Sequence, residues 1–77
     1  MDDAGRIDQF TAPFGGQEIE LLEVQYPAGG IPLLRVRIRE RKRFTIFEID
    51  PITAERWGND MLQWARQQKA AAKDAED

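Results

Sequence analysis

The side chains best suited to chemistry lie in one basic run in the middle of the chain. Residues 35–43, RVRIRERKR, contain six cations and one glutamate, so the segment carries a charge of +5. In a strand, alternate side chains project from one face about 6.6–6.8 Å apart, a spacing that suits successive phosphates. One hypothesis is therefore a site for nucleic acid or another polyanion. Its candidate residues are Arg35, Arg37, Arg39, Arg41, Lys42 and Arg43.

The same arginines also fit the solvated outer face of a sheet, neutralised in part by Glu18 and Glu20. The whole chain has a net charge of −3, which disfavours nonspecific binding to nucleic acid. We therefore expect the arginines to be paired chiefly with glutamates of a neighbouring strand. Reversing the charge of Glu20 would then cost under about 1 kcal/mol.

The composition excludes the common catalytic chemistries. The 77 residues include no cysteine, no histidine and no serine. Disulfides, thiolate or imidazole metal sites, and Ser-His or Cys-His nucleophiles cannot be built. The paired glycines lack the lysine and flanking pattern of a phosphate-binding loop. The sequence predicts a protein that is not an enzyme and that uses no cofactor and no metal.

The elements that would position the basic run are three strands in succession. Residues 17–26 alternate in hydrophobicity with one phase slip, which predicts a strand with a β-bulge near Leu21 and Leu22. Residues 27–30, PAGG, predict a turn. Residues 31–39 alternate without interruption, and residues 44–49, FTIFEI, predict the third strand.

Charge pairing sets the register that we expect for the first hairpin. Pairing Tyr26 with Ile31 places opposite charges across the two strands on one face and apolar side chains on the other. The expected partners are Glu20 and Arg37, Glu18 and Arg39, Ile19 and Ile38, and Leu21 and Val36. For the second hairpin, pairing Ile38 with Arg43 sets Leu34 opposite Phe47 and Val36 opposite Thr45.

A helix is expected to begin at Asp50-Pro51, because Asp is a favoured N-cap and Pro suits the first helical position. At 100° per residue, Trp57, Met61 and Trp64 lie on one apolar side of this helix. Such a stripe is most often the core face of a helix packed on a sheet. We therefore expect both tryptophans to be mostly buried against the strands.

The third strand is apolar on both of its faces, and the helix can cover only one of them. The second face would hold Leu22, Leu33, Phe44 and Ile46 beside the arginines, and we expect something to cover it. The cover could be Phe10 and Phe14 of the N-terminal segment, a second copy of the chain, or another protein. These four residues are the candidate partner surface.

The expected fold class is α+β: a three-stranded antiparallel β-meander, followed by one C-terminal amphipathic helix packed on one face, with an extended N-terminal arm. The expected boundaries are residues 1–16 for the arm, 17–68 for the β-β-β-α domain and 69–77 for a frayed polar tail. A single core of this size supplies only about 3–5 kcal/mol of net stability, which favours oligomerisation.

One stretch of the chain resembles a known group of proteins. The segment FTIFEIDPITAERWG is similar to part of a family of short bacterial proteins of unknown function. The resemblance implies a bacterial source and carries no activity and no site residues.

Together these observations predict a small non-catalytic protein-interaction module, either a self-associating domain or an accessory subunit of a bacterial assembly. The alternative is a nucleic-acid or polyanion-binding module built on residues 35–43. The acidic N-terminus lacks the apolar core of a secretory signal, and no apolar stretch approaches the roughly 20 residues that span a bilayer. We therefore expect a cytoplasmic protein with a protein partner and no membrane contact.

Overall fold

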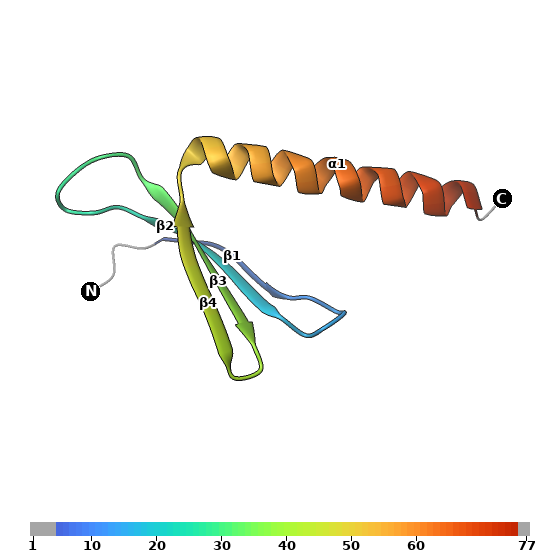
Figure 1. The fold of residues 1–77 in the computed structure, drawn as a ribbon, viewed down its shortest axis with the longest axis horizontal. Coiled ribbons are helices and arrows are strands. Elements are labelled where there is room, and N and C mark those ends of the chain that lie inside the picture. The colour runs from blue at the N-terminus through green and yellow to red at the C-terminus, as the bar shows by residue number, and fades with distance from the viewer. Residues whose placement is uncertain (1–4, 76–77) are drawn as a thin grey trace.

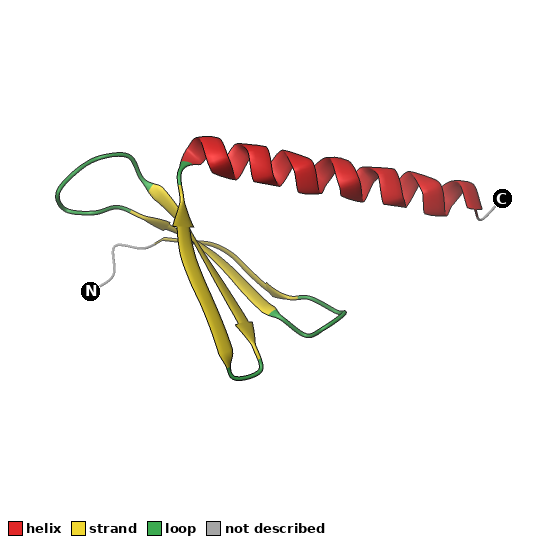
Figure 2. Ribbon diagram, in the orientation of Figure 1, coloured by secondary structure: helices red, strands yellow, loops and turns green. Residues whose placement is uncertain are grey.

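A computed structural model describes residues 5–75 as an antiparallel sheet followed by one long helix (Figures 1 and 2). The strands are β1 (Gly5–Thr11), β2 (Glu18–Val24), β3 (Leu33–Glu40) and β4 (Arg43–Ile49), and the helix is α1 (Pro51–Ala75). The strands follow one another across the sheet in the order β1-β2-β3-β4. The α+β class and the meander are confirmed, but the sheet has four strands where we expected three.

The additional strand is β1, which lies within the expected N-terminal arm. All seven of its residues are exposed, and its sequence, GRIDQFT, has no apolar alternation that could have revealed a strand. Its backbone pairs with β2, and the amide of Ala12 donates a 2.8 Å hydrogen bond to the carbonyl of Gln17 at the turn between them. The register shifts between Arg6 and Asp8. The irregularity therefore lies in β1, opposite Leu21 and Leu22, and not within β2 as expected.

The register expected for the first hairpin is confirmed at all four of its pairs, from Glu18 with Arg39 to Leu21 with Val36. The loop between β2 and β3 covers residues 25–32. It contains two left-handed residues, Gly29 at φ 94° and Gly30 at φ 97°. An amide hydrogen bond from Gly29 to the carbonyl of Tyr26, 3.0 Å long, closes the turn.

The register expected for the second hairpin is wrong by two residues. Val36 pairs with Phe47, and Ile38 pairs with Thr45. The connection between the paired Glu40 and Arg43 is only two residues long, and its Arg41 adopts a left-handed φ of 58°. Because side chains alternate with period two, a shift of two residues leaves every side chain on its expected face.

Helix α1 begins where the sequence predicted it. The carboxylate of Asp50 accepts hydrogen bonds from the amides of Ile52 (3.0 Å) and Thr53 (3.1 Å), which satisfies two of the orphan donors of the first turn. The helix then continues to Ala75 through residues expected to form a frayed tail. The helical part of that expected tail, residues 69–75 (KAAAKDA), has high helix propensity even though it carries no large apolar side chain.

The helix does not lie along the sheet for its whole length. It leaves the end of β4, passes the sheet near β3, and projects past the strands, so that helix and sheet diverge like the arms of a V (Figure 1). The radius of gyration is 15.7 Å, against about 11.5 Å for a compact domain of this length. The apolar core is accordingly small, and its buried members among the described residues are Val24 and Val36.

Candidate interaction surfaces

The two faces of the sheet differ in chemistry. We call the face that α1 approaches the helix-side face, and the register assigns its apolar residues as Phe10, Ile19, Leu21, Leu34, Val36, Ile38, Phe47 and Ile49. We call the opposite face, which holds Arg35, Arg37 and Arg39, the outer face. Phe10 pairs with Ile19 and so belongs to the helix-side face, while Phe14 lies exposed in the β1–β2 turn. The N-terminal phenylalanines therefore do not cover the outer face.

On the helix-side face, the helix is anchored by one aromatic contact. The rings of Phe47 and Trp57 have centroids 5.7 Å apart and an interplanar angle of 47°, an arrangement typical of favourable aromatic pairs. Val36, the cross-strand neighbour of Phe47, is only 3% exposed. The helix thus adds to the packing around Val36 on this face, whereas the other buried apolar residue among those described, Val24 of β2, pairs with Leu33 on the outer face.

Beyond that anchor, the apolar stripe of the helix is open to solvent. Trp57 is 42% exposed and Trp64 is 65% exposed, with Met61 also more than half exposed. The expectation that both tryptophans are mostly buried is therefore wrong for the single chain. The helix diverges from the sheet after its first turns, so the stripe faces the sheet across a gap instead of packing on it.

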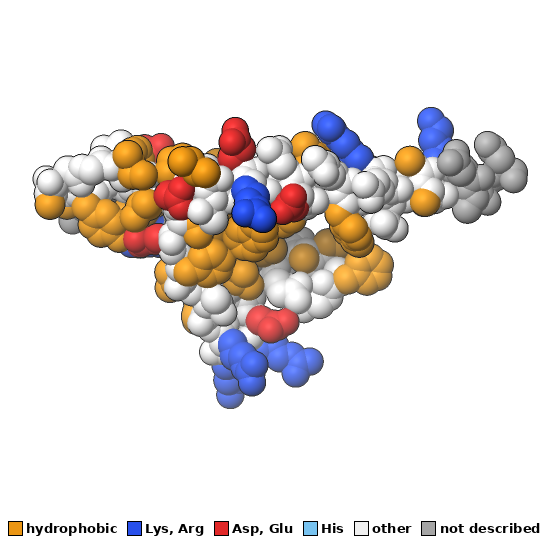
Figure 3. Space-filling model, turned by 45° about the horizontal axis from the view of Figure 1, so that its top comes forward, with side chains coloured by type: hydrophobic (Ala, Val, Ile, Leu, Met, Phe, Trp, Pro, Cys, Tyr) orange, Lys and Arg blue, Asp and Glu red, His pale blue; other side chains and the backbone are white. Residues whose placement is uncertain are grey.

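This gap is a wedge-shaped apolar cleft between α1 and the helix-side face. Figure 3 shows hydrophobic side chains on the underside of the helix, bordering the hollow beneath it. Near the start of the helix, a groove of about 450 Å³ is lined mainly by apolar side chains, among them Ile7, Leu34 and Ala54, with Glu23 and Glu55 at its border. Trp57, Met61 and Trp64 lie farther along the helix and do not line this groove. We use the name helix–sheet cleft for the groove together with the space between this stripe and the helix-side face.

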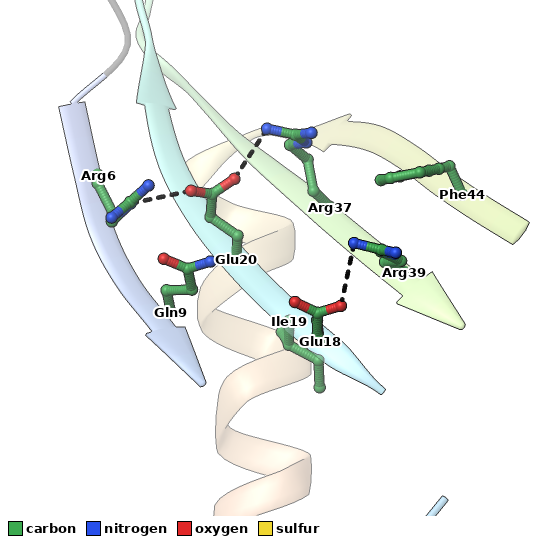
Figure 4. Close-up of a pocket in the computed structure, with 8 residues that line it drawn as sticks. All are labelled: Arg6, Gln9, Glu18, Ile19, Glu20, Arg37, Arg39 and Phe44. Atoms are coloured by element: carbon green, nitrogen blue, oxygen red, sulfur yellow. Dashed lines mark hydrogen bonds and ion pairs between the residues drawn. The ribbon is translucent and has the colours of Figure 1, made fainter. Parts of the chain in front are cut away.

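The outer face is dominated by ion pairs instead. Glu20 is only 9% exposed, and its two carboxylate oxygens contact Arg6 at 2.9 Å and Arg37 at 3.0 Å. Glu18 contacts Arg39 at 3.4 Å, although this pair is more exposed. The sequence-based expectation that strand glutamates pair with the arginines is confirmed for Arg37 and Arg39. These ion pairs line a shallow cavity of about 220 Å³. Figure 4 shows the full lining: Arg6, Gln9, Glu18, Ile19, Glu20, Arg37, Arg39 and Phe44.

Arg35, the remaining arginine of the column on β3, is held by a separate cluster of hydrogen bonds. Arg35 donates two hydrogen bonds to one oxygen of Glu48, at 2.8 and 2.9 Å, and the hydroxyl of Tyr26 donates to the other oxygen at 2.5 Å. The hydrogen bond from Tyr26, followed by those from Arg35, lowers the pKa of Glu48. The same bond to Glu48 raises the pKa of Tyr26. This cluster ties the β2–β3 loop to β4.

The candidate partner surface of the outer face is divided. Phe44 and Ile46 lie together on the edge strand β4, 57% and 54% exposed. Leu22 and Leu33 are half-buried near the other end of the sheet. The register puts the arginines of β3 between the two pairs, because Arg37 faces Ile46 and Arg35 faces Leu22. The four residues share one face, as expected, but they do not form one continuous apolar patch.

The remaining cations of the basic run lie at the tip of the β3–β4 hairpin, where Figure 3 shows a cluster of blue side chains. Arg41, Lys42 and Arg43 line an open cavity of about 720 Å³ with Glu40 and Gly15. They do not take part in the ion pairs found among residues 5–75, unlike Arg35, Arg37 and Arg39. The structure thus separates the six candidate residues into a paired column and a charged tip.

Two participants in the outer-face pairs, Arg6 and Glu48, were not singled out from the sequence. Arg6 could not be placed because β1 was not expected to be a strand. Glu48 left a signal, since it shares the phase of Phe44 and Ile46 in the FTIFEI segment. The correct register puts it opposite Arg35, a charge match that the expected register lacks.

Within the part of the chain that the structure describes, no group of three or more carboxylates is arranged to hold a metal ion. No helix in that part is both long and apolar enough to cross a membrane.

The fold and its surfaces define a small α+β domain with an open helix–sheet cleft. Residues 1–67 match the Family of unknown function (DUF6967), and the chain belongs to this family. The matched segment includes all four strands and the apolar stripe of the helix through Trp64. No curated protein and no solved structure matches the chain.

Proposed function

We propose that this protein is a non-catalytic protein-interaction module, which acts by taking up a protein surface in its helix–sheet cleft. The observation that supports the proposal is the exposure of Trp64, 65%, on a helix whose apolar stripe faces an apolar sheet across a gap. Contiguous apolar surfaces of this kind mark binding sites in soluble proteins. Tryptophan and methionine are also residue types that interfaces favour.

The small core supports the same proposal. Two buried apolar residues among those described, Val24 and Val36, are few for a domain without disulfides. A partner that fills the cleft would bury the stripe and extend the core. The protein would then be a self-associating domain or an accessory subunit of a bacterial assembly, with a cytoplasmic location.

Site-specific photo-crosslinking in cells tests this function. A benzophenone amino acid at Met61, on the apolar stripe, is expected to form a covalent adduct with a protein. The same probe at Gln63, two residues away on the polar side of the helix, is the matched control and is expected to form none. Absence of a protein adduct at position 61, or equal labelling at both positions, would contradict the proposal.

Binding of a polyanion is the second candidate function, and the charged tip of the β3–β4 hairpin supports it. Arg41, Lys42 and Arg43 line one open cavity there. The proposal is the weaker of the two because Arg35, Arg37 and Arg39 already have carboxylate partners. A site on the tip would lose affinity for an oligonucleotide steeply with salt and on replacing Lys42 by Glu. Salt-independent or undetectable binding would exclude it.

A further inference from the structure

We propose that the occupant of the helix–sheet cleft is a second copy of this chain, with the helix of each copy seated in the cleft of the other about a two-fold axis. This inference rests on the proposed function and names its partner.

The amount of exposed surface supports a second copy. The chain exposes 6761 Å², whereas a compact monomer of 8.9 kDa is expected to expose about 4,800 Å². The excess of about 2,000 Å² per chain is larger than the roughly 800 Å² per partner of a standard interface. Counted for two copies, about 4,000 Å², it lies in the range of total area that obligate homodimers bury. One symmetric interface could therefore remove the whole excess.

The shape of the chain supports the same occupant. A two-fold interface requires one surface to be complementary to itself. Here each copy carries both halves of such a surface: a projecting helix with an exposed apolar stripe (Figure 1), and an apolar sheet face whose side chains are mostly half-buried, with Phe10 exposed at its β1 edge. When two such wedges interlock, the stripe of each helix meets the sheet of the other copy as well as its own.

The outer face is a poorer place for this contact. Its exposed apolar pair, Phe44 and Ile46, stands beside Arg39 and Arg37, and the guanidinium of Arg39 lies 5.9 Å from the centre of the Phe44 ring. Burial of that face would desolvate the ion pairs, which costs free energy. The helix-side face carries its large apolar residues without such a column of charge.

Sedimentation equilibrium of the purified chain, together with two substitutions on the helix, tests the dimer. We expect a mass twice the 8.9 kDa of the chain at tens of micromolar. Trp64→Asp should raise the dimer dissociation constant by roughly 100-fold, because a charge replaces a central aromatic anchor. Gln63→Asp, on the polar side of the same helix, is the matched control and should leave the constant within about threefold.

A third substitution checks which face is used. Phe44→Asp on the outer face should also leave the dimer intact. A dimer that survives Trp64→Asp but is lost in Phe44→Asp would overturn the proposed arrangement. If circular dichroism shows that the Trp64→Asp variant is unfolded, the test uses the wild type instead, with its tryptophan emission recorded over a dilution series. Tryptophan emission should then shift to the red at the concentration where the mass halves, and a constant emission maximum would contradict burial in the interface.

Because the chain contains no cysteine, a mixture of two single-cysteine variants reports directly whether the helix of one copy lies in the cleft of the other. A short bismaleimide should couple Met61→Cys in one copy to Phe10→Cys in the other, and Gln63→Cys should not couple to Phe10→Cys. A result that contradicts the dimer can be distinguished from a result that contradicts the proposed function. A strictly monomeric chain with crosslinks to a different protein at Met61 overturns the second copy alone, and a monomer without crosslinks overturns both.

Discussion

The two faces of the sheet satisfy their side chains in different ways. On the outer face, the chain supplies partners for its own arginines, and Glu20 alone forms ion pairs with Arg6 and Arg37 from two different strands. On the helix-side face, the chain supplies a helix that covers the sheet only near Phe47 and Trp57. The contrast indicates that the arginines of the outer face find carboxylate partners within the single chain, whereas the apolar stripe of the helix stays largely exposed.

This difference follows from the reach of the interactions. An ion pair is satisfied by one neighbour across a strand, so a correct register is enough to pair the arginines of the outer face. An apolar face needs contiguous cover over its whole area, because its stabilisation is proportional to the area removed from water. A helix that diverges after its first turns cannot supply that cover.

The largest effect expected is on the core of the helix-side face. Val36→Asp places an unpaired charge where the side chain is 3% exposed, and the cost should exceed the roughly 3–5 kcal/mol that a core of this size supplies. We expect an unfolded chain by circular dichroism. The matched control is Ile46→Asp on the outer face, which is 54% exposed and should keep its cooperative melt. Equal behaviour of the two variants would show that the faces do not differ in burial.

The next effect is expected at the centre of the outer face. Glu20→Lys removes the shared partner of Arg6 and Arg37 and adds a third cation, and we expect a loss of about 2 kcal/mol in the free energy of unfolding. This is more than the sequence alone suggested, because Glu20 is buried and bridges two arginines. Glu18→Lys, at the exposed pair with Arg39, should cost under about 1 kcal/mol. Urea titration measures both, and a larger loss for Glu18→Lys would contradict the assigned roles.

Acid should weaken the interaction of Glu48 with Arg35 and Tyr26 on the outer face. The pKa of Glu48 is lowered in the folded chain by hydrogen bonds from Tyr26 and Arg35. The carboxylate therefore stabilises the fold at pH values above its unfolded pKa, and that contribution is lost as the pH falls through the lower folded pKa. Melting temperatures of wild type and Glu48→Gln should differ most at neutral pH and converge in acid. A gap that widens on acidification would contradict the assignment.

The smallest effect is expected where the chain passes from the sheet to the helix. Asp50→Ala removes the acceptor for the amides of Ile52 and Thr53, and it should lower the melting temperature by a few degrees without altering the register of the sheet. Asp50→Asn is the control, since it keeps a capping oxygen, and it should lose less. An alanine variant that melts with the wild type would show that this cap does not help to hold the helix.

Local patterns predicted much of this fold. The alternation of residues 31–39 and the charges of Glu18 and Glu20 predicted the β2–β3 register correctly, and Asp50-Pro51 marked the start of the helix. The same charge test also applies to the β3–β4 hairpin. Pairing Arg35 with Glu48 and Glu40 with Arg43 selects the observed register, whereas the register expected from Ile38 and Arg43 ignored those charges.

Other features had no local signal. Strand β1 is exposed at every position and is defined by backbone pairing with β2, which hydrophobic alternation cannot reveal. The expected burial of Trp57 and Trp64 assumed that the apolar side of a helix lies on its own sheet. The direction of α1 relative to the strands decides that point, and periodicity within the helix carries no information about it.

The sequence by itself determined the elements that depend on neighbouring residues: β2, β3, β4, the start of α1, the pairing of Glu20 with Arg37, and the absence of cysteine, histidine and serine. Only the tertiary structure decided that β1 completes the sheet, that Arg6 shares Glu20, and that the helix leaves the sheet with its stripe exposed. The physical reason is the range of the interactions. Periodicity and capping act over a few residues, whereas strand addition and helix direction depend on how distant segments meet in space.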